Sequence, residues 1–421
     1  MIKINKQRLI QKYFYPLVLF AILTSKVNAQ VDVSKVLSQN IIEPSPTATS
    51  LGKYGEYPVS LYNGLININQ NLLKINSGEL SLNVSLSYHA GGNKPSDIPG
   101  WVGLGFSLNA GGVITRIVQD LPDDKQGGFY TSLNEIKAQM TNYVPNYVFI
   151  QHYMERRFDA KSDRYLFNFN GYSGEFMLDW EGNVQFLKAE PFKITINKSL
   201  FSFDSFDITT EDGTVYTFAN PEQSRYTTSQ GSGEYYNSSW YLSNIKNAKG
   251  STITFQYSTG TKYRYKQHSS ERLAIGALTT HPYLYIHDEQ IATGNDVDKV
   301  IYLEEITFDN GKLIFHTSKR LDPYYVPNSS SSNSAEERKL DSIVLKGRDG
   351  VAKRRWELIY IENNERLKLK TLISRDLKSN QYEKYEFFYN AQKLLSTLGL
   401  MSIPLIPIVL TIGGTTTERL T

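Results

Sequence analysis

One pattern recurs six times between residues 165 and 389. It consists of an apolar strand, a polar turn containing Gly, Asp or Asn, and a second strand that ends in an aromatic residue. A single hairpin cannot bury an apolar face by itself, so the six should pair side by side in one long antiparallel sheet. The spacing is irregular, which makes this a degenerate repeat within a mainly β fold. The units cover residues 165–178 (with a turn at 171–174), 208–218, 242–257, 303–315, 340–360 and 369–389.

The composition is that of a strand-forming chain. Among 421 residues there are 29 Tyr and 20 Phe, against only 4 Trp, and aromatic residues are enriched in strands. The chain contains no Cys, which excludes disulfides, thiolate metal sites and a Cys nucleophile. The absence of Cys does not argue for the cytosol, because an exported protein can be stabilised by sheet area alone.

The region before the repeats also predicts strands. Asn63-Gly64 favours a two-residue hairpin turn, and residues 80–88 alternate strictly between apolar and polar side chains, as in a half-buried strand. The segment 101–116 is rich in glycine, but Leu108 stands where a dinucleotide-binding loop needs its third glycine, and no Gly-Lys-Ser/Thr follows. We therefore interpret these glycines as sites of bulges or close backbone contacts within a sheet.

A small helical insertion interrupts the strands. Ser132 and Glu135 have the spacing of a capping box, and Ile136, Met140 and Tyr143 continue one helical face. A second short helix is expected over 147–157. Residues 271–295 are ambiguous, and another insertion there stays open.

The first 29 residues have the pattern of a cleavable signal peptide. A basic stretch precedes an uncharged, mostly apolar run over 13–25, and small residues lead to a cleavage site after Ala29. The apolar run is too short for a comfortable membrane span, and without Cys a lipoprotein anchor is excluded. We therefore expect an exported protein located in the periplasm, at the cell surface or outside the cell.

Cleavage changes the charge balance. The net charge of the whole chain is +3, and residues 1–29 hold five basic and no acidic residues, so the remainder carries 3 − 5 = −2. A slightly acidic protein has no general electrostatic reason to bind nucleic acid.

The predicted organisation has six parts. The last part is an apolar tail, of which residues 394–417 carry no charge. A membrane tail, a buried strand pair and non-native sequence all remain open for it, although Pro404 and Pro407 disfavour a spanning helix. In order, the parts are a signal peptide (1–29), an extended lead-in (30–50), an N-terminal β region with the glycine-rich stretch (51–130), the helical insertion (131–160), the hairpin repeat region (161–390) and the tail (391–421).

Motifs for catalysis and metal binding are weak. Ser173 resembles a nucleophile elbow, but Glu175 replaces the required glycine. Asp296 and Asp298 begin a calcium-like pattern that Val300 breaks. None of the six histidines forms a close pair with metal-ligand spacing. They are His89, His152, His268, His281, His287 and His316.

Charged side chains are plentiful without indicating a site. Carboxylates such as those of Asp179, Glu181, Glu304 and Glu305 are expected on solvent faces. The basic residues within 346–355 are interpreted as a solvated turn, with an anionic partner as the less favoured alternative. The sequence predicts no catalytic, cofactor-binding or metal site.

Five stretches together resemble the N-terminal region of the RHS/YD-repeat (RHS repeat-associated core) proteins of Bacteroidetes-type bacteria. They are residues 50–64, 86–90, 101–116, 167–174 and 240–245, and the resemblance runs from about residue 46 to 390. In that family, the resemblance implies, β sheets spiral into a hollow shell, and the C-terminal part carries Tyr-Asp repeats and often a toxin or effector tip. This chain has no run of Tyr-Asp repeats and no core segment, which places a polymorphic-toxin role of its own in doubt.

Three functions follow as hypotheses. The first is an exported, non-enzymatic RHS-like shell or scaffold segment of a large surface or secreted protein, with further RHS-type β shell or an encapsulated effector as partner. It predicts exposed strand edges toward the C-terminal end. The alternatives are a cell-surface adhesin or glycan-binding β protein and a carbohydrate-active hydrolase. No cofactor is expected, and membrane contact is expected only through 394–417.

Overall fold

The computed structural model describes residues 67–89, 99–140, 147, 151, 158–225, 235–260, 263–269, 290–320, 337–361, 366–389 and 409–413. All of these residues belong to one compact unit, Ile41–Thr421. The predicted signal peptide, the lead-in and the Asn63-Gly64 turn lie outside the described residues.

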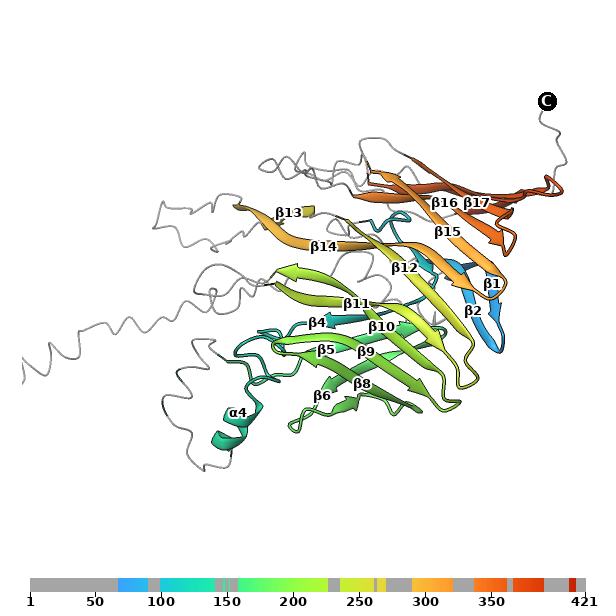
Figure 1. The fold of residues 1–421 in the computed structure, drawn as a ribbon. Helices are drawn as coiled ribbons and strands as arrows, with labels where there is room; N and C mark the ends of the chain where they lie inside the picture. The colour runs from blue at the N-terminus through green and yellow to red at the C-terminus, as the bar shows by residue number, and fades with distance from the viewer. Residues whose placement is uncertain are drawn as a thin grey trace, which may run out of the picture. The chain divides into compact units, whose positions relative to one another are not determined.

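The described part is built almost entirely of strands, as predicted (Figure 1). None of its helices is long and apolar enough to cross a membrane. In chain order the elements are β1 (Asn67–Ser77), β2 (Leu80–His89), β3 (Phe106–Asn109), β4 (Gly112–Ile117), α4 (Leu133–Met140), β5 (Arg164–Phe169), β6 (Tyr172–Leu178), β7 (Val184–Phe186), β8 (Phe192–Ser199), β9 (Ser202–Thr210), β10 (Val215–Arg225), β11 (Tyr235–Lys246), β12 (Thr252–Gly260), β13 (Tyr263–Ser269), β14 (Gln290–Phe308), β15 (Gly311–Lys319), β16 (Arg338–Gly347), β17 (Ala352–Ile361), β18 (Lys368–Asp376), β19 (Tyr382–Phe388) and β20 (Val409–Gly413).

The six predicted hairpins share one long antiparallel sheet, which confirms the fold expected from the repeats. They are β5–β6, β9–β10, β11–β12, β14–β15, β16–β17 and β18–β19. The first turn is tighter than predicted. Phe169 pairs with Tyr172, so the turn is Asn170-Gly171 and not 171–174. Both turn residues have positive φ (43° and 88°), as a two-residue hairpin turn of this kind requires.

The large sheet branches at β11. Residues 239–241 of this strand pair with β4, and residues 244–246 pair with β12. Strand β4 leads through β5 and β6 to β7, while β12 leads through β14 to β20. Strand β8 pairs with β9, β9 pairs with β10, and β10 pairs with β11.

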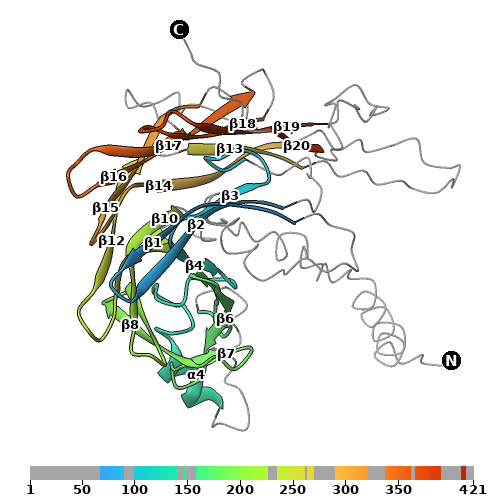
Figure 2. The same cartoon turned by 90° about the vertical axis from the view of Figure 1, so that its right-hand side faces the viewer.

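A three-stranded sheet, β1-β2-β3, packs against the large sheet. Its strand β2 alternates as predicted, with Leu80, Leu82 and Leu86 buried. At the β1–β2 turn, the Ser77 hydroxyl donates to the Thr252 carbonyl (2.9 Å) and accepts from the Asp309 amide (3.1 Å). These contacts tie the hairpin to the turns of β11–β12 and β14–β15, beside which Figures 1 and 2 show it.

The glycine-rich stretch supplies close contacts within the fold, as interpreted from the sequence. A Cβ on Gly105 (φ +77°) would lie 2.6 Å from the Tyr88 ring, and one on Gly112 would lie 2.5 Å from Cβ of Phe169. Trp101, which opens the stretch, is buried among aromatic rings, with Tyr302 6.1 Å and Phe315 6.5 Å away between centroids. The stretch therefore bridges the two sheets.

The helical insertion is confirmed at α4, which begins one residue after Ser132 and buries Ile136. Of the expected second helix, Tyr147 and Gln151 are helical, and its other residues lie outside the described part. The region 271–295, whose structure the sequence leaves open, is described only in part. Residues 290–295 belong to β14, and residues 271–289 lie outside the described part. In the tail, β20 pairs with β19.

Candidate functional site

The most highly charged part of the core surrounds Arg116 on β4, at the end of the glycine-rich stretch. Its Nε donates to Oδ2 of Asp163 (2.6 Å) and its Nη1 donates to Oδ1 of Asp124 (2.7 Å). All three side chains are at most 2% exposed. The Nη2 atom has no hydrogen-bond partner, and the guanidinium carbon lies 5.6 Å from the ring centroids of Tyr165 and Tyr236. Such aromatic faces attract a cation electrostatically.

A third buried carboxylate, Asp123, belongs to the same network. Asp123 and Asp163 exchange backbone-to-side-chain bonds, since the Asp123 amide donates to Asp163 Oδ2 (3.0 Å) and the Asp163 amide donates to Asp123 Oδ1 (2.9 Å). Tyr165 completes the set, because its hydroxyl donates to Asp123 Oδ2 (3.1 Å). One guanidinium therefore stands among three buried carboxyl groups.

Burial and like charge perturb these groups. Burial and the neighbouring Asp163 raise the pKa of Asp123 well above its ordinary value, and Arg116 opposes the shift only in part. Burial also raises the pKa of Asp163, against the opposing attraction of Arg116. For Arg116, burial alone would lower the pKa, but the attraction of Asp124 and its other anionic neighbours outweighs that effect and raises it. The arginine therefore stays charged.

Asp159 is a fourth carboxyl group near this network. It accepts from the amides of Leu121 (3.1 Å) and Lys161 (2.8 Å). Burial raises its pKa from 3.8 to about 7, and these two hydrogen bonds oppose the shift. Its protonation therefore changes near neutral pH.

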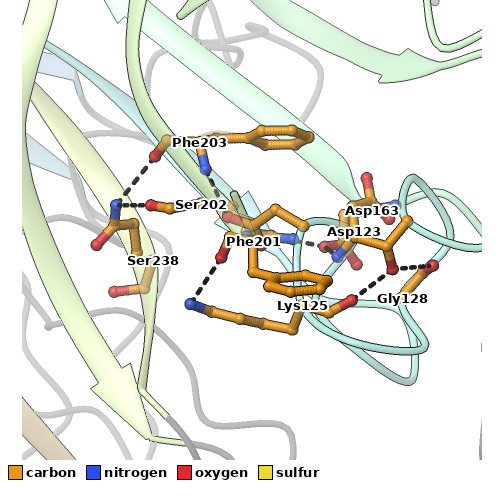
Figure 3. A network of polar contacts seen from close by, with 12 residues as sticks. Asp123, Lys125, Gly128, Asp163, Phe201, Ser202, Phe203 and Ser238 are labelled. Atoms are coloured by element: carbon orange, nitrogen blue, oxygen red, sulfur yellow. Dashed lines mark hydrogen bonds and ion pairs between the residues drawn. The ribbon is translucent and has the colours of Figure 1, made fainter. Parts of the chain in front are cut away.

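The network also holds the β8–β9 turn. The Phe203 amide donates to Asp124 Oδ2 (2.7 Å), and Nζ of Lys125 donates to the Phe201 carbonyl (3.0 Å), as Figure 3 shows for Lys125. Phe201 has a φ of +59°, a strained conformation for a bulky residue. The loop after β4 and the turn before β9 are thus fixed to each other.

This arrangement points to a structural function for the network. Asp123 and Asp163 are fully buried, so a reactant from solvent does not reach their carboxyl oxygens. Their hydrogen-bond partners are backbone amides, Arg116, Tyr165 and the Ser162 hydroxyl. The network holds the loop after β4 against β5 and β9.

The candidate catalytic and metal-binding residues suggested by sequence motifs do not belong to this network. Ser173 lies within strand β6, whereas a nucleophile elbow needs a strand-to-helix turn. Asp296 and Asp298 lie within strand β14, not in a calcium-binding loop. Within the described ranges, no group of three or more His, Asp or Glu side chains is placed to hold a metal ion.

The other charged residues lie at turns and in surface pairs. Asp179 accepts the amides of Glu181 (2.9 Å) and Asn183 (2.8 Å) in the β6–β7 turn, and Glu305 pairs with Lys312 at 2.9 Å. In the basic hairpin β16–β17 the arginines meet acidic neighbours. Arg354 lies 3.9 Å from Glu383, and Arg355 lies 3.4 Å from Glu357. Both arginines lie on strand β17 and are partly exposed.

The Arg116 network is not predicted from the sequence. Arg116 ends the glycine-rich stretch, and Asp163 is 47 residues away along the chain. The adjacent pair Asp123-Asp124 was the one local signal. Two consecutive acidic residues also occur on ordinary surface turns, so this signal does not distinguish a buried pair from an exposed one.

The comparisons with known proteins identify no family. No family model matches the chain, and no curated protein matches it. Among solved structures, a crystal structure of TcdB2-TccC3 aligns with 79% of this chain and 16% of that chain, at 14% identity and a TM-score of 0.42. A structure of the Photorhabdus luminescens Tc holotoxin pore aligns with 78% of this chain and 16% of that chain, at 13% identity and a TM-score of 0.40. This chain thus spans about a sixth of the length of those chains.

Proposed function

We propose that this chain is an exported, non-enzymatic scaffold segment, similar to an RHS shell, whose sheet continues by pairing with further β structure. The observation that supports this proposal most directly is the unpaired edge of strand β20 (Val409–Gly413). This strand pairs with β19 on one edge, and among the described strands no register pairing joins its other edge to a strand. An unpaired edge presents a row of N–H and C=O groups that can pair with another strand.

Three further observations support the proposal. The buried ionisable groups around Arg116 are used to hold loops together, as expected of a scaffold. The leader-like pattern of residues 1–29 supports export, and the five stretches that resemble RHS proteins support a shell-type role. The proposed partner is further RHS-type β shell, and an enclosed effector is the cargo that such a shell would hold.

Sedimentation velocity of the purified chain over a range of concentrations tests the proposal. We expect concentration-dependent association, because free edges of different copies can pair. A Thr411→Lys substitution places a charge on β20 and should reduce the association. The matched control is Thr254→Lys, at an exposed position of β12, which has strand partners on both edges. A strictly monomeric wild-type chain would contradict the proposal.

A second candidate, a glycan-binding surface protein, has one observation in its favour. Trp180 (41% exposed) and Tyr172 (37% exposed) present aromatic side chains to solvent, and sugars stack on exposed aromatic rings. A glycan array distinguishes the two functions. Binding that is lost in Trp180→Ala would favour the glycan-binding function, and no binding to any sugar would remove its support.

A further inference from the structure

A groove of about 510 Å³ runs between strands β7 and β8. On the β8 side its lining includes five consecutive residues, 192–196, and on the other side it includes Gly182, Asn183 and Val184. Successive side chains of a strand point to opposite faces, so a groove on one face would be lined by every second residue. Consecutive lining residues therefore place this groove along the edges of the strands.

Both edges have no partner strand on the groove side. Strand β7 pairs with β6, strand β8 pairs with β9, and within the described residues no pairing joins β7 to β8. Residues 187–191 connect them, and five residues can span about 16 Å. Two strand spacings amount to about 9.6 Å. The connection is therefore long enough for one additional strand to lie between β7 and β8.

The two faces of the groove differ in character. Phe192 and Ile194 are buried on one face of β8, and Phe186 meets Phe192 edge-on with 5.3 Å between ring centroids. On the other face Lys193 is exposed, and the lining contains no acidic residue. A strand placed here would turn alternate side chains toward an apolar surface and toward positive charge.

The lining residue Tyr130 is held in place. Nζ of Lys198 donates to the Tyr130 hydroxyl and lies 4.4 Å from the centroid of its ring. A Cβ on Gly182 (φ +80°) would lie 2.9 Å from that ring, so the tyrosine packs directly on the turn before β7. A groove with fixed walls costs less conformational entropy when a ligand binds.

We infer that this groove is a strand-addition site, which binds an extended segment of another polypeptide in which apolar and acidic residues alternate. Main-chain hydrogen bonds to the edges of β7 and β8 supply part of the affinity, and the alternating side chains supply the selectivity. Charge complementarity with Lys193 specifies the acidic residues. The site is separate from β20, so it does not depend on the proposed scaffold function.

Fluorescence anisotropy with labelled heptapeptides tests the inference on the full chain. The probe alternates Val and Glu. One control peptide alternates Val and Lys, and another replaces the central Val by Pro, which removes a backbone donor. We expect the Val/Glu peptide to bind and each control to bind at least about tenfold more weakly. Equal binding of all three, or no binding of the Val/Glu peptide at millimolar concentration, would overturn the inference.

Variants locate the site. Lys193→Glu should weaken Val/Glu binding by about tenfold, whereas Lys370→Glu, at an exposed position of the interior strand β18, should leave it unchanged. Hydrogen exchange of the unmodified chain gives a second readout. The bound peptide should slow exchange within 184–186 and 192–196. Equal effects of the two substitutions, or slowed exchange only elsewhere, would overturn the assignment to this groove.

Discussion

The Nε atom of Arg116 lies 2.6 Å from Oδ2 of Asp163, and both side chains are fully buried. This ion pair joins β4 to the residue that precedes β5, and the guanidinium lies near the buried rings of Tyr165 and Tyr236. A buried pair of this kind adds little net stability compared with apolar residues, but removing one partner leaves the other charge without compensation.

Replacing Arg116 by Met should strongly destabilise the fold. Asp124 and Asp163 would lose their cation while remaining buried, and we expect the free energy of unfolding to fall by about 3–5 kcal/mol. Urea denaturation measures it. The control is Lys161→Met, which removes a 57%-exposed partner of Asp120 and should change stability by less than about 1 kcal/mol. Similar losses for both variants would contradict the assigned role of Arg116.

The stability of the fold should decrease as pH rises from about 4 to about 7. Burial raises the pKa of Asp159 from 3.8 to about 7, so between these values the folded chain binds more protons than the unfolded chain, and rising pH favours unfolding. Asp123 and Asp163 act in the same direction. Above about pH 7 the contribution of Asp159 is fully lost.

Asp159→Asn tests this pH dependence. The substitution should reduce the difference in unfolding free energy between pH 5 and pH 8 by on the order of 2 kcal/mol. Asp212→Asn is the control, since the Thr210 hydroxyl lowers the pKa of Asp212 and that group stays ionised throughout this range. A variant at position 159 with an unchanged pH profile would show that Asp159 does not titrate there.

Two turn glycines should differ sharply when they are replaced by Ala. At Gly250 (φ +90°) an added Cβ meets nothing within 4 Å, so only backbone strain of about 1–2 kcal/mol is expected. At Gly311 (φ +149°) the Cβ would lie 2.1 Å from the Lys346 carbonyl oxygen, and β15 would have to move away from β16. We expect a loss on the order of 3 kcal/mol or more in thermal denaturation, and equal losses would contradict this packing.

The hairpins could be predicted because their signals are local. Asp212-Gly213 and Lys249-Gly250 occupy turns where the glycine has positive φ, and such turns depend on the identity of one or two adjacent residues. The alternation of 80–88 likewise reports burial directly, residue by residue. The predicted first turn at 171–174 lies too late in the chain, because Gly174 is not a turn residue but lies within β6 against the Phe167 ring.

The candidate sites could not be predicted because they depend on distant contacts. Arg116 meets Asp163 only once β4 and β5 pair, and no spacing in the sequence encodes that contact. The groove lies between β7, a strand of three residues, and β8, neither of which belongs to a recurring unit. The sequence indicates which segments form strands, but which edges lack a partner depends on the order of strands in the sheet.

The most direct test of the scaffold account is hydrogen exchange at β20 as a function of protein concentration. If β20 pairs with further strands, the outward-facing amides within 409–413 should exchange more slowly as copies associate. Exchange within the interior strand β16 should stay the same at all concentrations. This combination is the result that the account predicts. Exchange at β20 that is rapid and independent of concentration, in a chain that remains monomeric, would contradict it.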